Sequence, residues 1–233
     1  MDTSQVILAA SVWVLPVLFA ITLHEASHGW VAWQLGDDTA KRLGRVTFNP
    51  LRHIDPVGTI LVPGLLLLPA LLGGGSTILF GWAKPVPVNF RRLHRPRRDM
   101  VLVAAAGPAI NLLLAIASVV LYRASDAVPG AAGQWMATNF VNSIIINLVL
   151  MVFNMLPLPP LDGGRVAVGL LPRRLAIPLA RLEPMGFLII IGALFLLPWL
   201  GGTLGVDIDI FGWLIGGPVS FLFNLIVGLT GRF

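Results

Sequence analysis

Apolar stretches alternate with short polar connections along the whole chain. A membrane-spanning helix needs about 20 predominantly apolar residues. Stretches of this kind cover residues Val6–Leu35, Met100–Tyr122, Met136–Leu156, Met185–Leu200 and Phe211–Leu229. The pattern therefore predicts an all-α polytopic membrane protein, with no internal repeat and no separate soluble domain.

One further apolar stretch, Val57–Phe80, is interrupted by two prolines and a triple glycine. The flanking residues 36–55 and 81–99 are both basic, so both should face the same side of the membrane. An element that begins and ends on one side cannot cross the bilayer once. We expect it to be re-entrant, which requires shielding by protein or by a water-filled cavity. The alternative is an ordinary span that departs from the charge rule.

We expect residues 1–233 to form a single membrane-embedded domain. Its predicted parts are core helices at about 6–35, 100–122 and 136–162, a re-entrant region at about 45–90, and two C-terminal helices at about 185–200 and 211–229. Within the re-entrant region, Val/Thr alternation and prolines favour short β segments around Arg45–Asn49 and Pro85–Asn89. An exposed strand edge there could accept an unwound substrate as an added strand.

The composition supports a membrane protein. Only 12% of the residues are charged and 56% are hydrophobic, whereas about a quarter of a soluble domain is charged. The net charge of +5 comes from residues in the loops, which is typical of membrane proteins and not of nucleic-acid-binding domains. The chain has no cysteine, so any metal must be held by His, Asp or Glu.

Lysine and arginine also predict the orientation. Ten lie between the first helix and Met100 and four follow the helix that ends near Leu156, whereas the opposite loops hold only Arg123. The basic side should be cytoplasmic, with the N-terminus outside and the C-terminus inside. The apolar N-terminal stretch has no positive leading region and no obvious cleavage site, so we expect it to be a retained membrane helix.

The residues His24-Glu25-Ala26-Ser27-His28 carry the main candidate chemistry. On a helix, positions i and i+4 share one face, so both imidazoles can reach one Zn²⁺. Glu25 is expected to act as the base and not as a ligand. A helix end at the aqueous interface is the alternative, but the motif directly follows the apolar run Leu15–Leu23. Ionisable groups inside a membrane cost roughly 2.5–3.5 kcal/mol and are functional by default.

A catalytic zinc usually has three protein ligands, so a third must come from elsewhere. Asp162 follows a membrane helix that should run parallel to the first, and both elements would then approach the cytoplasmic end of the membrane. The alternative for Asp162 is a turn or cap aspartate in an Asp-Gly sequence. We expect His53, Asp55 and His94 to lie outside the metal site.

Asn111 and Asn154 are polar residues in or near apolar helices. Either could hydrogen-bond an oxyanion or hold a substrate strand. The alternative is a hydrogen bond between helices, which we favour for Asn142 and Asn147. Gly107 is expected to allow close helix packing.

Several spaced motifs make the chain resemble the site-2 proteases, which are intramembrane zinc metalloproteases, and in particular their short prokaryotic branch. The motifs that carry the resemblance are His24–Gly29, Leu35–Ala40, Gly44–Pro50, His53–Pro56, Gly81–Asn89, Gly107–Asn111 and Pro160–Gly164. The resemblance extends to about Pro172. The PDZ and nucleotide-sensing domains of better-studied members are not expected here.

The resemblance implies three core helices, with His24, His28 and Asp162 as ligands of one zinc ion per chain and Glu25 as the base. It implies cleavage of a membrane protein's own transmembrane helix, often in regulated intramembrane proteolysis, in a prokaryotic cell membrane. The expected partners are a transmembrane substrate and the lipid bilayer, and no nucleic acid. A membrane metal-ion transporter and an inactive protease-like scaffold are the alternatives, although neither needs Glu25. The sequence predicts neither the substrate nor the oligomeric state.

Overall fold

The computed structural model describes residues 3–62, 64–65 and 81–230, and their regular elements are all helical. The long helices are α1 (Thr3–Gln34), α4 (Pro96–Tyr122) and α5 (Gly130–Asn154). The shorter ones are α2 (Thr39–Arg42), α6 (Asp162–Leu170), α7 (Arg173–Ala180), α8 (Glu183–Ile191), α9 (Leu197–Thr203) and α10 (Gly217–Thr230). Single helical turns cover Pro50–Arg52, Pro56–Leu61, Phe90–Arg92, Arg123–Ala127, Gly192–Leu196 and Gly212–Gly216.

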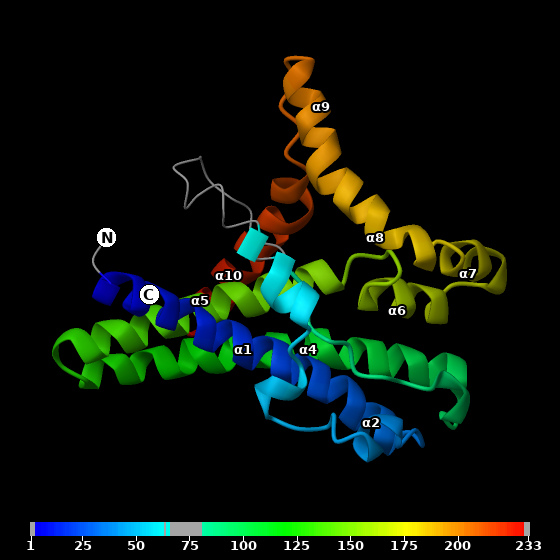
Figure 1. Ribbon diagram of the computed structural model, residues 1–233, viewed down its shortest axis with the longest axis horizontal. Helices are drawn as coiled ribbons and strands as arrows, with labels where there is room; N and C mark the ends of the chain where they lie inside the picture. Colours follow the sequence, from blue (N-terminus) through cyan, green and yellow to red (C-terminus); the bar gives the residue numbers. More distant parts are fainter. Residues whose placement is uncertain (1–2, 63, 66–80, 231–233) are drawn as a thin grey trace.

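Helices α1, α4 and α5 form the core of the molecule. The helices α4 and α5 are joined by the turn Arg123–Ala127 and lie side by side as a hairpin, and α1 packs against both of them (Figure 1). The helix α4 also packs against α6. This arrangement brings residues from three separate parts of the sequence to one place between α1, α4 and the start of α6.

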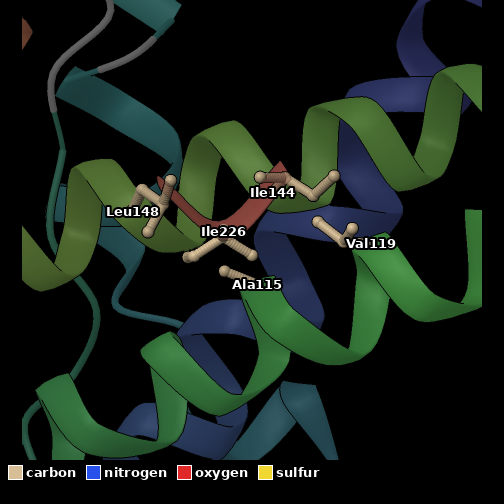
Figure 2. Close-up of a cluster of buried hydrophobic side chains, with 5 residues drawn as sticks. All are labelled: Ala115, Val119, Ile144, Leu148 and Ile226. Carbon is tan, nitrogen blue, oxygen red and sulfur yellow. The ribbon is translucent and has the colours of Figure 1, made fainter. Parts of the chain in front are cut away.

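An apolar cluster joins the hairpin to the C-terminal helix α10. Ala115 and Val119 of α4 contact Ile144 and Leu148 of α5, and Ile226 of α10 closes the cluster (Figure 2). Ala115, Ile144 and Leu148 are completely buried. The cluster therefore buries apolar side chains of three helices against one another.

A proline inside α1 explains one of the polar residues of α5. Pro16 has no N–H, so the carbonyl of Val12 lacks its usual partner within the helix. The side chain of Asn142 donates to that carbonyl, with Nδ2 2.8 Å from the Val12 oxygen. This hydrogen bond between helices agrees with the packing role predicted for Asn142.

The chain leaves the core after α5 and turns sharply into α6. The predicted core helix 136–162 instead begins at Gly130 and ends at Asn154, because Pro157, Pro159 and Pro160 cannot continue it. Asp162 is then the first residue of a new helix, α6. A Cβ added to Gly163 would lie 2.2 Å from the Met155 carbonyl oxygen, so this loop can fold tightly against α6 only without a side chain there.

Within the described part of the chain, four helical stretches are long and apolar enough to cross a membrane, namely Pro96–Ala127, Gly130–Asn154, Glu183–Thr203 and Gly212–Leu229. The last two confirm the predicted C-terminal helices, since α8 and α9 form one continuous stretch, and α10 begins just after the turn Gly212–Gly216. The helix α1, with 32 residues, is also longer than the ~20 residues that a span requires. The chain is therefore an all-α membrane protein.

The predicted β segments are not formed in the described residues. Around Arg45–Asn49, side chains take backbone N–H groups that a strand would need for pairing. Thr47 Oγ1 accepts a hydrogen bond from the Asn49 N–H, and Asn49 Oδ1 accepts one from the Leu51 N–H. The segment Pro85–Asn89 is extended, but it is not paired as a strand. Pro85 and Pro87 have no N–H to give to a ladder. Most of the predicted re-entrant element, residues 66–80, lies outside the described residues.

Candidate metal centre

Three buried side chains from α1 and α6 meet at one point. His24 Nε2 and His28 Nε2 lie 3.1 Å apart, as expected for positions i and i+4 on one helix. Asp162 Oδ2 lies 3.2 Å from the first nitrogen and 3.3 Å from the second. Among the described residues, these form the group of histidine and acidic side chains able to hold a metal ion.

The protonation of His28 follows from its partner. Its Nδ1 lies 2.7 Å from the carbonyl oxygen of Val103 in α4. A carbonyl can only accept a hydrogen bond, so Nδ1 carries the hydrogen and Nε2 of the neutral ring is a bare lone pair. This is the tautomer that leaves Nε2 free to bind a metal.

The protonation of His24 follows from a chain of polar contacts. Asn147 Nδ2 donates to the Ser143 carbonyl, so Asn147 Oδ1 must face Asn111 and accept from its Nδ2 at 2.7 Å. Asn111 Oδ1 is thereby turned toward His24 Nδ1, 2.5 Å away. Because this oxygen only accepts, Nδ1 of His24 carries a hydrogen, and in the neutral ring its Nε2 is also a lone pair.

The donor set fits a zinc ion. Two lone pairs and a carboxylate oxygen lie at mutual distances of 3.1 to 3.3 Å. Tetrahedral ligands about 2.0–2.1 Å from zinc would be about 3.3 Å apart. Asp162 Oδ2 is also buried without a hydrogen-bond partner, which is costly unless a cation balances it.

Gly107 of α4 borders this triangle directly. A Cβ added to it would lie 2.4 Å from His28 Nε2 and 2.5 Å from His24 Nε2. This contact agrees with the expectation that Gly107 allows close helix packing, because it lets α4 approach the two histidines of α1.

Glu25 lies next to the histidines but contacts a different part of the chain. Its Oε2 accepts a hydrogen bond from the backbone N–H of Val86 at 2.7 Å. Its Oε1 accepts none from the described residues, so one carboxylate oxygen is available for proton transfer. Glu25 is half-buried, and it is not one of the three residues grouped around the metal position.

The remaining candidates are not brought to the triangle. Asn154 Nδ2 donates to the Leu150 carbonyl of its own helix, so its predicted site role stays a prediction. His53 Nε2 faces the Thr47 carbonyl, and Asp55 caps the turn Pro56–Leu61. Neither residue, nor the exposed His94, belongs to the metal group.

Three contributors to the site were not predicted from the sequence, namely the Val103 carbonyl, the Asn147 amide and the Val86 N–H. Two are backbone groups, which no residue type signals. Asn147 was noticed as a polar residue, and its spacing of four from Ser143 was the available signal. Its partner Asn111, however, lies on another helix.

Comparison with known proteins identifies relatives that are all named putative zinc metalloproteases. The chain is 40% identical over 189 residues to "Putative zinc metalloprotease YwhC" of Bacillus subtilis, covering 79% of this chain and 80% of that protein. It is 30% identical over 197 residues to "Putative zinc metalloprotease Rip2" of Mycolicibacterium smegmatis, covering 82% and 70%.

A third relative, "Putative zinc metalloprotease Rip3" of Mycobacterium tuberculosis, is 34% identical over 157 residues, which are 62% of this chain and 35% of that protein. No family model and no solved structure matches the chain. The match to YwhC spans four fifths of both proteins, and this chain belongs to the zinc metalloprotease family that contains YwhC and Rip2.

Proposed function

We propose that the protein is a zinc-dependent intramembrane endopeptidase that hydrolyses a peptide bond in or near a transmembrane segment of another membrane protein. The observation that carries this proposal is the triangle of His24 Nε2, His28 Nε2 and Asp162 Oδ2, with Glu25 beside it. Its membrane helices and its family membership support the same function.

The three ligands would be His24, His28 and Asp162, holding one zinc ion per chain. When bound, zinc would polarise the scissile carbonyl and acidify an attacking water. Glu25 would accept the proton of that water at Oε1 and later donate it to the leaving amine nitrogen. Because the bilayer core supplies no water, we propose that the site opens to the basic, cytoplasmic side.

Asn111 acts on the metal ligand in this proposal. It is completely buried, and its amide is engaged by His24 and Asn147. Neither side of the amide is therefore available to a substrate. Asn111 would fix the tautomer and ring orientation of His24. In other zinc sites, a carboxylate or a backbone carbonyl often does this by accepting a hydrogen bond from the second ring nitrogen of the histidine. Asn154 remains the candidate for contact with the substrate.

The finer assignments follow the resemblance to site-2 proteases. We propose that the protein acts in regulated intramembrane proteolysis. Its N-terminus would lie outside a prokaryotic cell membrane and its C-terminus inside. The distribution of lysine and arginine supports this orientation.

The presence of Glu25 favours a protease over a metal-ion transporter. A carrier needs ligands, but it does not need an additional carboxylate beside them that stays outside the metal group. An inactive scaffold would not need that carboxylate either. Metal flux through proteoliposomes without cleavage would favour the transporter.

The experiment is co-expression with a panel of single-span membrane proteins that carry a tag at each end, comparing the wild type with Glu25→Gln. We expect one or more panel members to be cut by the wild type and none by the variant, while zinc content is equal in both. Equal cleavage by both forms would contradict the mechanism. Loss of zinc from Glu25→Gln would show that Glu25 is a ligand and not the base.

A further inference from the structure

The extended segment Trp82–Asn89, here called the strap, is bound to the rest of the protein through its backbone. The Trp82 N–H donates to the Gly58 carbonyl at 3.1 Å and the Lys84 N–H to the His53 carbonyl at 2.9 Å. Two carboxylates bind the other half of the strap. Glu25 accepts from the Val86 N–H at 2.7 Å, and Asp37 accepts from the Asn89 N–H at 2.6 Å.

The bound residues alternate along the first part of the strap. In extended backbone the N–H and C=O of one residue point to one side, and those of the next residue point to the other. Trp82, Lys84 and Val86 face the protein, whereas Pro85 and Pro87 fall on the opposite side and have no N–H. The prolines also restrict φ, so the strap is held extended before it meets Glu25.

Arg45 and His53 hold the strap at Lys84, two residues before Val86. Arg45 Nη2 donates to the Lys84 carbonyl at 2.7 Å, and the His53 carbonyl accepts from the Lys84 N–H. Both Arg45 and His53 are buried. The turn Pro56–Leu61 then binds Trp82 through Gly58 and Thr59. Arg45, His53 and the turn Pro56–Leu61 are not part of the proposed metal group, but their contacts fix the position of the strap.

The other contact of Val86 is with α1 itself. A Cβ on Gly29 would lie 3.1 Å from Val86 Cγ1, and Val86 is buried. The glycine that follows His28 therefore lets the strap approach the helix that carries the catalytic motif. Backbone and side chain of Val86 are both fixed, which directs its N–H at Glu25.

We propose that Val86 is a positioning residue, whose N–H holds Glu25 Oε2 so that Oε1 is left as the proton acceptor, and that Arg45 and His53 serve this contact through Lys84. The inference rests on the proposed function of Glu25 as the base. A glutamate side chain has several rotatable bonds, and holding one oxygen removes most of that freedom before the reaction begins.

The sharpest test replaces Val86 by proline. Residue 86 already lies between two prolines, so Val86→Pro removes the N–H from a backbone that is already restricted to extended conformations. We expect kcat for a doubly tagged single-span substrate to fall by about tenfold or more, with KM within about twofold and zinc content unchanged. Val86→Ala keeps the N–H and should restore most of the lost kcat.

The matched control is Val88→Pro, at a position whose N–H has no acceptor among the described residues. It adds a proline to the same segment and should keep kcat within about threefold of the wild type. A Val86→Pro enzyme with wild-type kcat would overturn the proposal. So would a rise in KM at constant kcat, which would assign the strap to substrate binding, or a loss of zinc.

A second measurement does not depend on catalysis. Amide hydrogen exchange of the peptide that contains the strap should show the Val86 N–H protected in the wild type and exposed in Glu25→Ala. Unchanged protection in that variant would overturn the proposal even if Val86→Pro fails to fold. The Glu25→Gln comparison keeps the two hypotheses apart. If Glu25→Gln cleaves like the wild type, the proposed function fails, whereas a dead Glu25→Gln with a normal Val86→Pro defeats only the role of Val86.

Discussion

His24 and Glu25 are neighbours in α1, yet different regions of the molecule hold them. His24 is oriented by side chains of α4 and α5, through Asn111 and Asn147. Glu25 is oriented by a backbone N–H of the strap, a segment without regular secondary structure. The helical core therefore orients the proposed metal ligand, and a loop segment orients the proposed base.

This division means that the two functions can be disrupted separately. Variants of the helical core should change zinc binding and cleavage together. Variants of the strap should change cleavage while zinc is retained. Metal content, measured on purified protein beside activity, is thus the measurement that distinguishes the two regions.

The largest effect is expected from Asp162→Ala. It removes one of the three proposed ligands and leaves two neutral histidines, so zinc retention and cleavage should both be lost. Elemental analysis of the purified protein measures the first and the tagged substrate the second. Asp126→Ala, at an exposed aspartate after α4, is the control and should keep both. Full zinc content in Asp162→Ala would mean that the third ligand lies elsewhere.

Nearly as large an effect is expected from Gly107→Ala. Alanine favours helices more than glycine by about 1 kcal/mol, so the helix α4 itself should still form. Its Cβ would nevertheless lie 2.4 Å from His28 Nε2, and zinc should be excluded. Gly228→Ala in α10, where a Cβ meets nothing within 4 Å, is the matched control. A Gly107→Ala protein that binds zinc normally would show that the ligand atoms can move apart.

A smaller loss is expected from Asn111→Leu. The substitution removes the acceptor for His24 Nδ1, and loss of such a partner typically weakens metal binding by about 10–100-fold. Competition with a chelator of known affinity measures this change. Unchanged zinc affinity would show that Asn111 serves only the packing of the helices and does not act on the metal ligand.

The smallest effect is expected from Asn147→Leu. Asn111 keeps its contact with His24, but the group that fixes the direction of its amide is lost. We expect zinc affinity to fall by about threefold to tenfold, less than for Asn111→Leu. Asn139→Leu in the same helix, where the amide donates to the Trp135 carbonyl, should leave zinc affinity unchanged. An equal or larger loss than in Asn111→Leu would show that Asn147 acts on the metal by another route.

The helical part of the molecule was largely predictable from the sequence. Hydrophobic stretches of sufficient length gave the core helices and both C-terminal spans, and the i, i+4 rule placed His24 and His28 on one face. Asp162 could be named because the chain offers few intramembrane acids. The boundaries were less predictable, since the helix ending at Asn154 stops where prolines intervene.

The strap region was not predictable to the same degree. Val/Thr alternation and prolines indicated extended chain, and extended chain is what Pro85–Asn89 forms. The prediction of strands was wrong because the N–H groups of the strap bond to carboxylates and to loop carbonyls. A pattern of residue types indicates which side chains share a face, but it does not predict which group accepts the hydrogen bond of a backbone N–H.

The polar chain from Ser143 through Asn147 and Asn111 to His24 has a consequence for assembly in the membrane. Each amide in it has one allowed direction, so a helix displaced by one residue turns its amide about 100° away and breaks the chain. Apolar contacts between the helices carry no such directional requirement. Zinc occupancy should therefore measure the fraction of molecules whose helices have assembled in the correct register, which would make it a quality test for this protein during expression and purification.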